Sequence, residues 1–195
     1  MKKGKILAVL MAGIISIVLT HTGAMAYIPP GVTSGYLYAS YTTQQKSNWC
    51  WVATAQNATI QEGCNIYDQY YAVYILKGAT PDFYPNVPGT IGDAKSAAEI
   101  ICDHALTYTT AGAKTFAFIS DKIYNGHSIM AGYTYVYNGS TYGHMVLLMG
   151  WSTSSGTEKV KFFDPGNGCY YTVTYAAFCS GMYNGSVYNA SCYVN

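Results

Sequence analysis

The hydrophobic pattern of the chain changes its period near residue 126, and this change constrains the fold more than any other feature of the sequence. Four segments ahead of it have the apolar spacing of helices: residues 50–61, 68–77, 90–105 and 115–124. Five segments behind it have the pattern of strands: residues 127–137, 143–151, 158–164, 169–175 and 186–194. Helices followed by strands predict an α+β domain, with an N-terminal helical half packed on a C-terminal antiparallel sheet and a cleft between them.

The expected helices carry local start and stop residues. Ser47 or Asn48 would cap the helix that begins at residue 50. Gly78 would end the second helix, and Thr90 with Asp93 resembles a capping box at the start of the third.

Residues 1–26 have the composition of an export signal. Lys2, Lys3 and Lys5 precede an uncharged apolar run over residues 6–19, and Ala24-Met25-Ala26 supplies a small-x-small cleavage site. The apolar run is shorter than the roughly 20 residues that a membrane-spanning helix needs. We therefore expect a cleaved signal peptide and a secreted mature chain, residues 27–195, that forms one domain.

The charge of the mature chain excludes several partners. The full chain has ten lysines and no arginine, three of the lysines lie in residues 1–26, and the remaining seven face nine acidic groups, a formal charge of −2. Without arginine or a basic stretch, the chain lacks the usual means of binding nucleic acid or an anionic membrane. We expect a monomer whose partner is a protein or peptide substrate.

The six cysteines are compatible with an oxidising compartment. They stand at positions 50, 64, 102, 169, 179 and 192. We expect Cys64 and Cys102 to form a disulfide between helical segments, and one further bridge among Cys169, Cys179 and Cys192 whose connectivity the sequence leaves open. No Cys-x-x-Cys or His/Cys cluster indicates zinc, so we expect no metal or cofactor.

A glutamine six residues ahead of a helix-starting cysteine is the most informative motif. Gln44 precedes Cys50, where the alanine-rich segment 50–61 begins. The partial positive charge of a helix N-terminus favours the nucleophilic thiolate. The amide of Gln44 and the backbone N–H of Cys50 would together form an oxyanion hole. The alternative is a buried structural cysteine or half-cystine, and the neighbouring glutamine and tryptophans favour the nucleophile.

His144 and Asp164 are the expected partners of this cysteine. His144 begins an apolar strand directly after Gly143, whereas His104 and His127 lie at helix ends and are the rival bases. Asp164 ends a strand, and Pro165 then turns the chain out of the sheet. A carboxylate there would accept the ring N–H of His144 and orient it. The alternative is an ordinary Asp-Pro-Gly surface turn.

Together these segments resemble papain-like cysteine peptidases of bacterial effector and secreted type, in particular the AvrRpt2-like group and the C39-like peptidases. The motifs that carry the resemblance are Gln44-x5-Cys50 with Trp49-Cys50-Trp51-Val52-Ala53, then Tyr142-Gly143-His144 where members have Gly-Gly-His, then Phe163-Asp164-Pro165. The resemblance covers residues 44–178. It implies a papain-like fold with Cys50 as nucleophile, His144 as general base, Asp164 as orienter and Gln44 in the oxyanion hole.

The same resemblance implies a secreted cysteine endopeptidase that hydrolyses peptide bonds. A peptidoglycan amidase or endopeptidase is an alternative on this fold, although the chain lacks a wall-binding repeat or basic surface. A non-catalytic secreted toxin or adhesion module is another, and the intact Gln, Cys, His and Asp argue against it. Acyl transfer needs the same residues as hydrolysis, so the sequence leaves these two reactions open.

Overall fold

The structure is a computed structural model that describes residues 28–80, 82–182 and 185–195. The expected export signal, residues 1–26, lies outside the described residues. The elements in chain order are β1 Ser34–Tyr36, α1 Cys50–Gln61, α2 Gln69–Lys77, α3 Ile91–Ile101, β2 Tyr108–Gly112, α4 Phe116–Tyr124, β3 Ile129–Tyr137, β4 Ser140–Ser152, β5 Lys159–Asp164, β6 Cys169–Thr174, α5 Tyr175–Ser180 and β7 Val187–Val194. No helix within these ranges is long and apolar enough to span a membrane.

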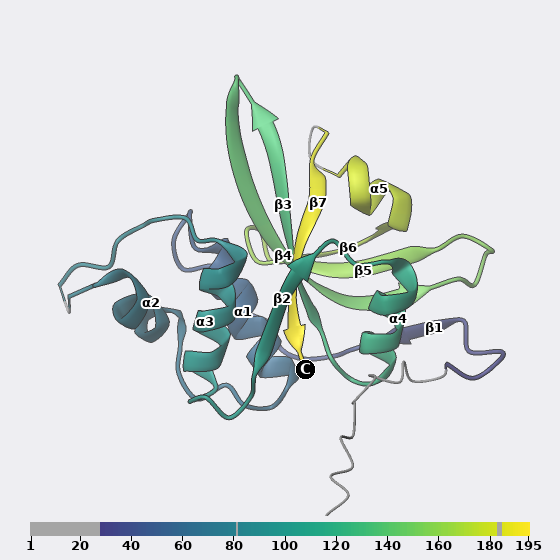
Figure 1. The fold of residues 1–195 in the computed structure, drawn as a ribbon, viewed down its shortest axis with the longest axis horizontal. Coiled ribbons are helices and arrows are strands. Elements are labelled where there is room, and N and C mark those ends of the chain that lie inside the picture. Colours follow the sequence, from purple (N-terminus) through teal and green to yellow (C-terminus); the bar gives the residue numbers. More distant parts are fainter. Residues whose placement is uncertain (1–27, 81, 183–184) are drawn as a thin grey trace, which may run out of the picture.

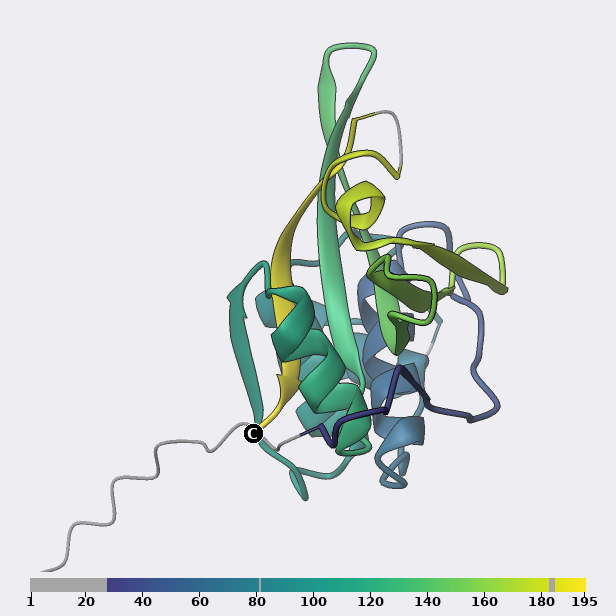
Figure 2. The same cartoon turned by 90° about the vertical axis from the view of Figure 1, so that its right-hand side faces the viewer.

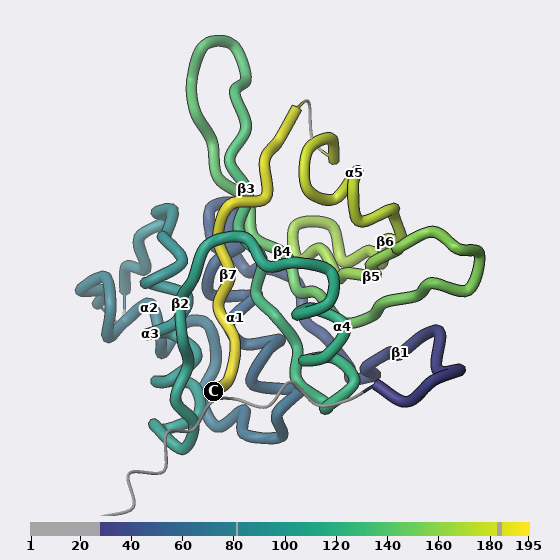
Figure 3. The backbone as a smooth tube through the Cα atoms, turned by 45° about the vertical axis from the view of Figure 1, so that its right-hand side comes forward, coloured from purple at the N-terminus to yellow at the C-terminus, as the bar shows by residue number. Residues whose placement is uncertain are grey.

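The strands form one antiparallel sheet in the order β2-β7-β3-β4-β5-β6. The short strand β1 pairs with the C-terminal end of β4. The last strand, β7, therefore lies between β2 and β3 (Figure 3). Helices α1, α2 and α3 gather beside the sheet (Figure 1). The β3–β4 hairpin extends beyond the body of the molecule (Figure 2). The α+β architecture predicted from the change of period is confirmed.

Helix α1 is buried on all sides, because it packs against α3 on one flank and β4 on another. Every residue from Trp51 to Thr59 is buried. Alanines at positions 53, 55 and 58 let the neighbouring elements approach closely, while Trp49 and Trp51 fill the space around the first turn. A helix buried all round needs no polar face, which explains why α1 has little amphipathic character.

Local capping residues explain most helix boundaries. The Asp68 side chain accepts the backbone N–H of Tyr71 at the start of α2, and Gly78 ends that helix in the left-handed conformation with φ 65°. Thr90 and Asp93 form the predicted capping box of α3.

The predicted cap of α1 is wrong. Trp49 occupies the cap position and no side chain caps the helix. Ser47 and Asn48 instead bond to Asn86, through Ser47 Oγ and through the backbone N–H and side chain of Asn48. A partner distant in sequence thus takes the groups that would otherwise have capped the helix.

Residues 46–51, on both sides of Cys50, bond to residues 84–87 through a ladder of side-chain donors and backbone carbonyls. Lys46 Nζ donates to the carbonyl of residue 84 at 2.6 Å, and Trp49 Nε1 donates to that of residue 85 at 3.0 Å. Asn48 Nδ2 reaches residue 86 at 2.9 Å, and Trp51 Nε1 reaches residue 87 at 3.2 Å. This ladder, named here the 84–87 ladder, holds the following residues 88–91 beside the N-terminus of α1.

Three short elements were not predicted, namely β1, β2 and α5, and the predicted helix 90–105 ends at Ile101. Strand β2 lies at the edge of the sheet and has the sequence Tyr-Thr-Thr-Ala-Gly, which lacks an apolar alternation. Beyond α3, Asp103 and His104 adopt left-handed backbone angles, φ 50° and 58°, which stop the helix.

The predicted disulfide between Cys64 and Cys102 is confirmed, and it joins the turn after α1 to the end of α3. The bridge predicted among Cys169, Cys179 and Cys192 is wrong, because all three are free. Cys169 lies in β6 and Cys192 in β7, four strand spacings apart in the sheet order. At about 4.8 Å per strand this separation is about 19 Å, whereas a disulfide needs Cα atoms within about 7 Å.

Gly89 provides a test of the contact between residues 88–91 and α1. A Cβ at Gly89 would lie 2.4 Å from the ring of Trp51, which is fully buried. We expect Gly89→Ala to lower the free energy of unfolding by about 1–3 kcal/mol, the usual cost of overpacking. Chemical denaturation measures this change.

Gly92→Ala is the matched control, because a Cβ there meets only Thr90 Oγ1, at 3.5 Å, and Gly92 lies within α3. Gly92→Ala should raise stability by about 0.4–1 kcal/mol. Equal effects of the two substitutions would contradict the close packing of Gly89 on Trp51.

Candidate active site

Cys50 is the first residue of α1 and is a free, half-buried thiol. Its place at the helix N-terminus is the one predicted from the sequence. Cys50 and His144 line the same cavity, and the thiol lies close enough to His144 to raise the pKa of its ring. The helix and the strand that carry these two residues come from the two halves of the molecule, so the site forms where the helices meet the sheet.

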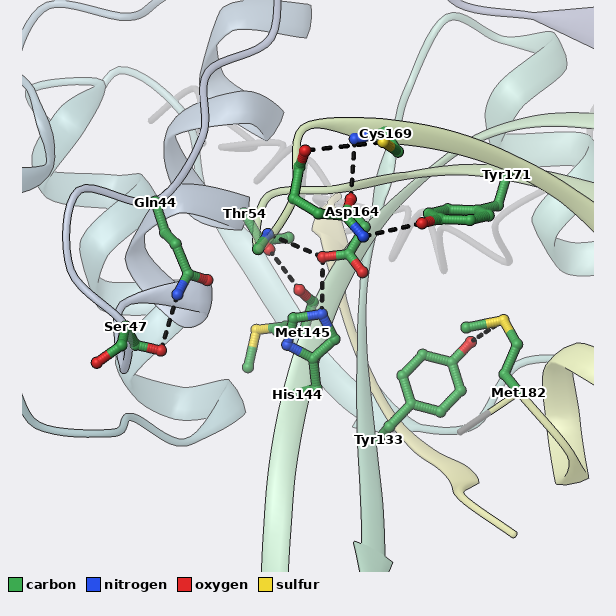
Figure 4. A network of polar contacts seen from close by, with 12 residues as sticks. Gln44, Ser47, Thr54, Tyr133, His144, Met145, Asp164, Cys169, Tyr171 and Met182 are labelled. Atoms are coloured by element: carbon green, nitrogen blue, oxygen red, sulfur yellow. Dashed lines mark hydrogen bonds and ion pairs between the residues drawn. The ribbon is translucent and has the colours of Figure 1, made fainter. Parts of the chain in front are cut away.

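His144 and Asp164 lie on the neighbouring strands β4 and β5. His144 Nε2 is 2.8 Å from Asp164 Oδ1 (Figure 4). The same carboxylate oxygen accepts the backbone N–H of Gly166 at 2.8 Å, and Asp164 is 3% exposed. The carboxylate thus fixes both the orientation and the tautomer of the ring.

The electrostatics of the site favour a charged imidazole. Burial alone would lower the pKa of His144, but hydrogen bonds to Asp164 and Cys50, together with the negative charges of these partners, raise it to about 9. A raised pKa keeps the imidazole protonated at neutral pH, and this is the form that can give a proton to a leaving group.

Gln44 lies against the turn that follows Asp164. Its backbone N–H donates to the carbonyl of Pro165 at 2.9 Å, and its side-chain Nε2 donates to the carbonyl of Ser47 at 2.7 Å (Figure 4). A Cβ at Gly166 would be 3.1 Å from Asp164 Oδ1, 3.4 Å from His144 Cε1 and 3.7 Å from Gln44 Oε1. The absence of a side chain at Gly166 lets these three groups approach one another. The structure therefore brings all four sequence-predicted residues to one place.

The two rival histidines lie elsewhere. His127 Nδ1 is 2.9 Å from Glu62 Oε2, and Glu62 follows the last residue of α1. A helix of 12 residues is about 18 Å long, so His127 lies at the end of α1 opposite to Cys50. His104 is exposed in the turn after α3. Neither can exchange a proton with the Cys50 thiol.

A cavity of about 230 Å³ opens beside Cys50 and His144. Four segments line it: residues 88–91, 132–134, 143–145 and 189–190. Its walls are mostly apolar, with Ile91, Tyr133, Met145 and Ala190 among them, and apart from Cys50 and His144 none of the lining residues is charged. The sequence analysis did not find this cavity, because segments about 100 residues apart form it together. Within the described residues, no group of three or more His, Cys, Asp or Glu side chains is arranged to hold a metal ion.

Comparison with solved structures shows a known fold. The chain is similar to digestive procathepsin L 3 from the larval midgut of Tenebrio molitor, with a TM-score of 0.60 and 10% identity over 88% of this chain and 72% of that chain. Procathepsin B S9 of Trypanosoma congolense and digestive procathepsin L2 of T. molitor match at 10% identity with TM-scores of 0.49 and 0.48, over 80% of this chain and 73% and 64% of theirs. These two scores are too low to add to the argument.

The chain therefore has the papain-like fold, as predicted. No protein-family model and no curated protein matches the sequence. At 10% identity the likeness shows the fold alone, and the resemblance to the bacterial groups stays a prediction.

The raised pKa of His144 gives a direct test of the site. We expect the imidazole to titrate near pH 9, and Asp164→Asn to lower its pKa because the hydrogen bond to a carboxylate and its charge are lost. Because the pKa lies above the ordinary value of about 6.5, protonation of His144 stabilises the fold fully below about pH 6.5. This contribution is lost as the pH rises through about 9.

NMR titration of the His144 ring measures this pKa. Asp103→Asn, which removes an exposed carboxylate from the turn after α3, is the control and should leave the titration of His144 unchanged. A midpoint at or below 6.5 in the unaltered protein would contradict the ion pair.

Proposed function

We propose that the protein is a secreted cysteine endopeptidase that hydrolyses peptide bonds. The observation that carries the proposal is the contact of a free thiol at a helix N-terminus with an imidazole that a buried carboxylate orients. This combination supplies a nucleophile, a proton carrier and an orienting group, which are the parts that nucleophilic acyl transfer requires.

In the first half of the proposed reaction, His144 holds the proton of the Cys50 thiol. The thiolate sulfur attacks the carbonyl carbon of the substrate, and a C–S bond forms while the carbonyl oxygen becomes an oxyanion. The backbone N–H of Cys50 and the side-chain amide of Gln44 would donate to this oxygen. An amide carries two N–H donors, so the bond from Gln44 to the Ser47 carbonyl leaves a second donor for the oxyanion. When the C–N bond breaks, the imidazolium gives its proton to the leaving amine.

In the second half, water attacks the thioester and His144 takes a proton from it. The C–S bond then breaks, the carboxylic acid leaves, and the thiol is regenerated. Asp164 keeps its hydrogen bond to Nε2 throughout, which stabilises the imidazolium formed in each half.

The cavity beside Cys50 supports a peptide as the substrate. Its volume of about 230 Å³ and its apolar walls suit one side chain of medium size without charge. Residues 88–91 on one side and 143–145 on the other would hold the extended chain that carries this side chain. The composition of residues 1–26 and the Cys64–Cys102 disulfide support export.

Cleavage of a protein substrate tests the proposed function. We expect the purified protein to cut unfolded casein under mild reducing conditions, and Cys50→Ala to abolish turnover while the fold remains, because the nucleophile is lost. Mass spectrometry of the products identifies the broken bonds, and transfer of the acyl group to an added amine separates transfer from hydrolysis. Unchanged activity in Cys50→Ala would refute the assignment of the nucleophile.

Gln44 and Gln45 form a matched pair for the oxyanion hole. Gln44→Ala should lower kcat by roughly 10²–10³-fold with little change in KM, the usual effect of deleting an oxyanion donor. Gln45 has the same amide, but it lines a separate cavity with Thr42, Gln56 and Tyr70. Gln45→Ala should therefore retain activity. The reverse pattern in steady-state kinetics would move the oxyanion donor to Gln45.

A further inference from the structure

A buried polar bond joins the helix that carries Cys50 to the strand that carries His144. Thr54 Oγ1 donates to the backbone carbonyl of Met145 at 3.1 Å (Figure 4). Thr54 is fully buried and Met145 is 5% exposed. Thr54 lies four residues after Cys50, and Met145 directly follows His144. The bond thus lies one helical turn from the nucleophile and one residue from the base.

The other buried polar side chains of α1 next to Thr54 bond to groups outside β4: Asn57 bonds the backbone of Thr42, and Gln56 accepts the side chain of Gln69. The apolar side chains around Thr54 include Val52 and the alanines at positions 53, 55 and 58. Apolar burial is non-directional, and alanines present few projections that interlock with a neighbour. A hydrogen bond has a narrow range of lengths and angles, and breaking it leaves a buried carbonyl without a partner. The Thr54–Met145 bond therefore resists both sliding and rotation of the helix.

We propose that Thr54 is a positioning residue that sets the register between α1 and β4, and with it the contact between Cys50 Sγ and His144. Residues i and i+4 of a helix lie on the same face, so Thr54 and Cys50 both face the strand that carries the histidine. A displacement of α1 by about 1 Å would change the distance between the thiol and the imidazole, and misplacement of this size can lower a rate by about 100-fold. This role rests on the proposed peptidase function.

Two substitutions separate the hydroxyl from the shape of the side chain. Thr54→Val keeps the branched shape and removes the donor, whereas Thr54→Ser keeps the donor. We expect Thr54→Val to lower kcat by about 10- to 100-fold with KM nearly unchanged, and Thr54→Ser to retain most of kcat. Thr54→Ala supplies a second variant without the hydroxyl, in case Thr54→Val does not fold, and alanine has the highest helix propensity.

Thr59→Val is the control for a loss of stability alone. Thr59 lies on the same helix and is equally buried, but its hydroxyl donates to the carbonyl of Gln56 within the helix, at 2.7 Å. Thr59→Val should lower the melting temperature and leave kcat unchanged. Equal loss of kcat in Thr54→Val and Thr59→Val, or full activity in Thr54→Val, would overturn the positioning role.

Alkylation of Cys50 by iodoacetamide gives a readout that does not require peptidase activity. In the unaltered protein, contact with the imidazole should make the Cys50 thiol reactive. Thr54→Val should lose this reactivity, Thr54→Ser and Thr59→Val should keep it, and mass mapping of Cys50 measures the rate. A protein that is alkylated in this pattern but cuts no peptide would refute the proposed function and uphold the positioning role. An alkylation profile that Thr54→Val leaves unchanged would overturn that role whatever the activity.

Discussion

The burial of α1 on every side is the constraint on which the rest of the structure depends. The helix lies between α3 and β4, and the tryptophans at its first turn are fully enclosed. An element enclosed in this way cannot adjust without disturbing all of its neighbours, because protein interiors are packed at crystal density. The residue at its N-terminus, Cys50, therefore has a defined place relative to the sheet. The reactive thiol lies at the edge of the best-packed element rather than on a loop.

The turn after β5 organises the other half of the site. One oxygen of Asp164 accepts hydrogen bonds from His144 and from the backbone of Gly166, while the carbonyl of Pro165 accepts the backbone N–H of Gln44. Three of the four candidate residues are thus tied to a single Asp-Pro-Gly turn. The turn differs from the common surface turn of the same sequence because Asp164 and Pro165 are buried, although Gly166 is exposed.

Features with local causes were predictable from the sequence, and features with distant causes were not. The ends of α2 and the start of α3 follow from Asp68, Gly78 and the Thr90–Asp93 pair, all of which act within one turn. The cap of α1 was mispredicted, because Asn86 bonds the two expected capping residues from across the fold. The Cys64–Cys102 pair was predicted correctly, whereas the bridge expected among the last three cysteines failed, since strand order separates Cys169 from Cys192. The candidate site residues could be predicted because the residue type and its immediate neighbours indicate the role of each. The cavity could not be predicted, because four segments that are remote in sequence form it.

The 84–87 ladder has a consequence for the substitutions that this part of the chain tolerates. Four side chains from residues 46–51 bond to the backbone carbonyls of residues 84–87, and every amino acid presents such a carbonyl. Most replacements among residues 84, 85 and 87 would leave these bonds intact. Residues 88–91, which wall the cavity, would then keep their position while the adjoining surface changes. The side chains at residues 84, 85 and 87 could therefore change during evolution while the hydrogen bonds that position the cavity wall remain.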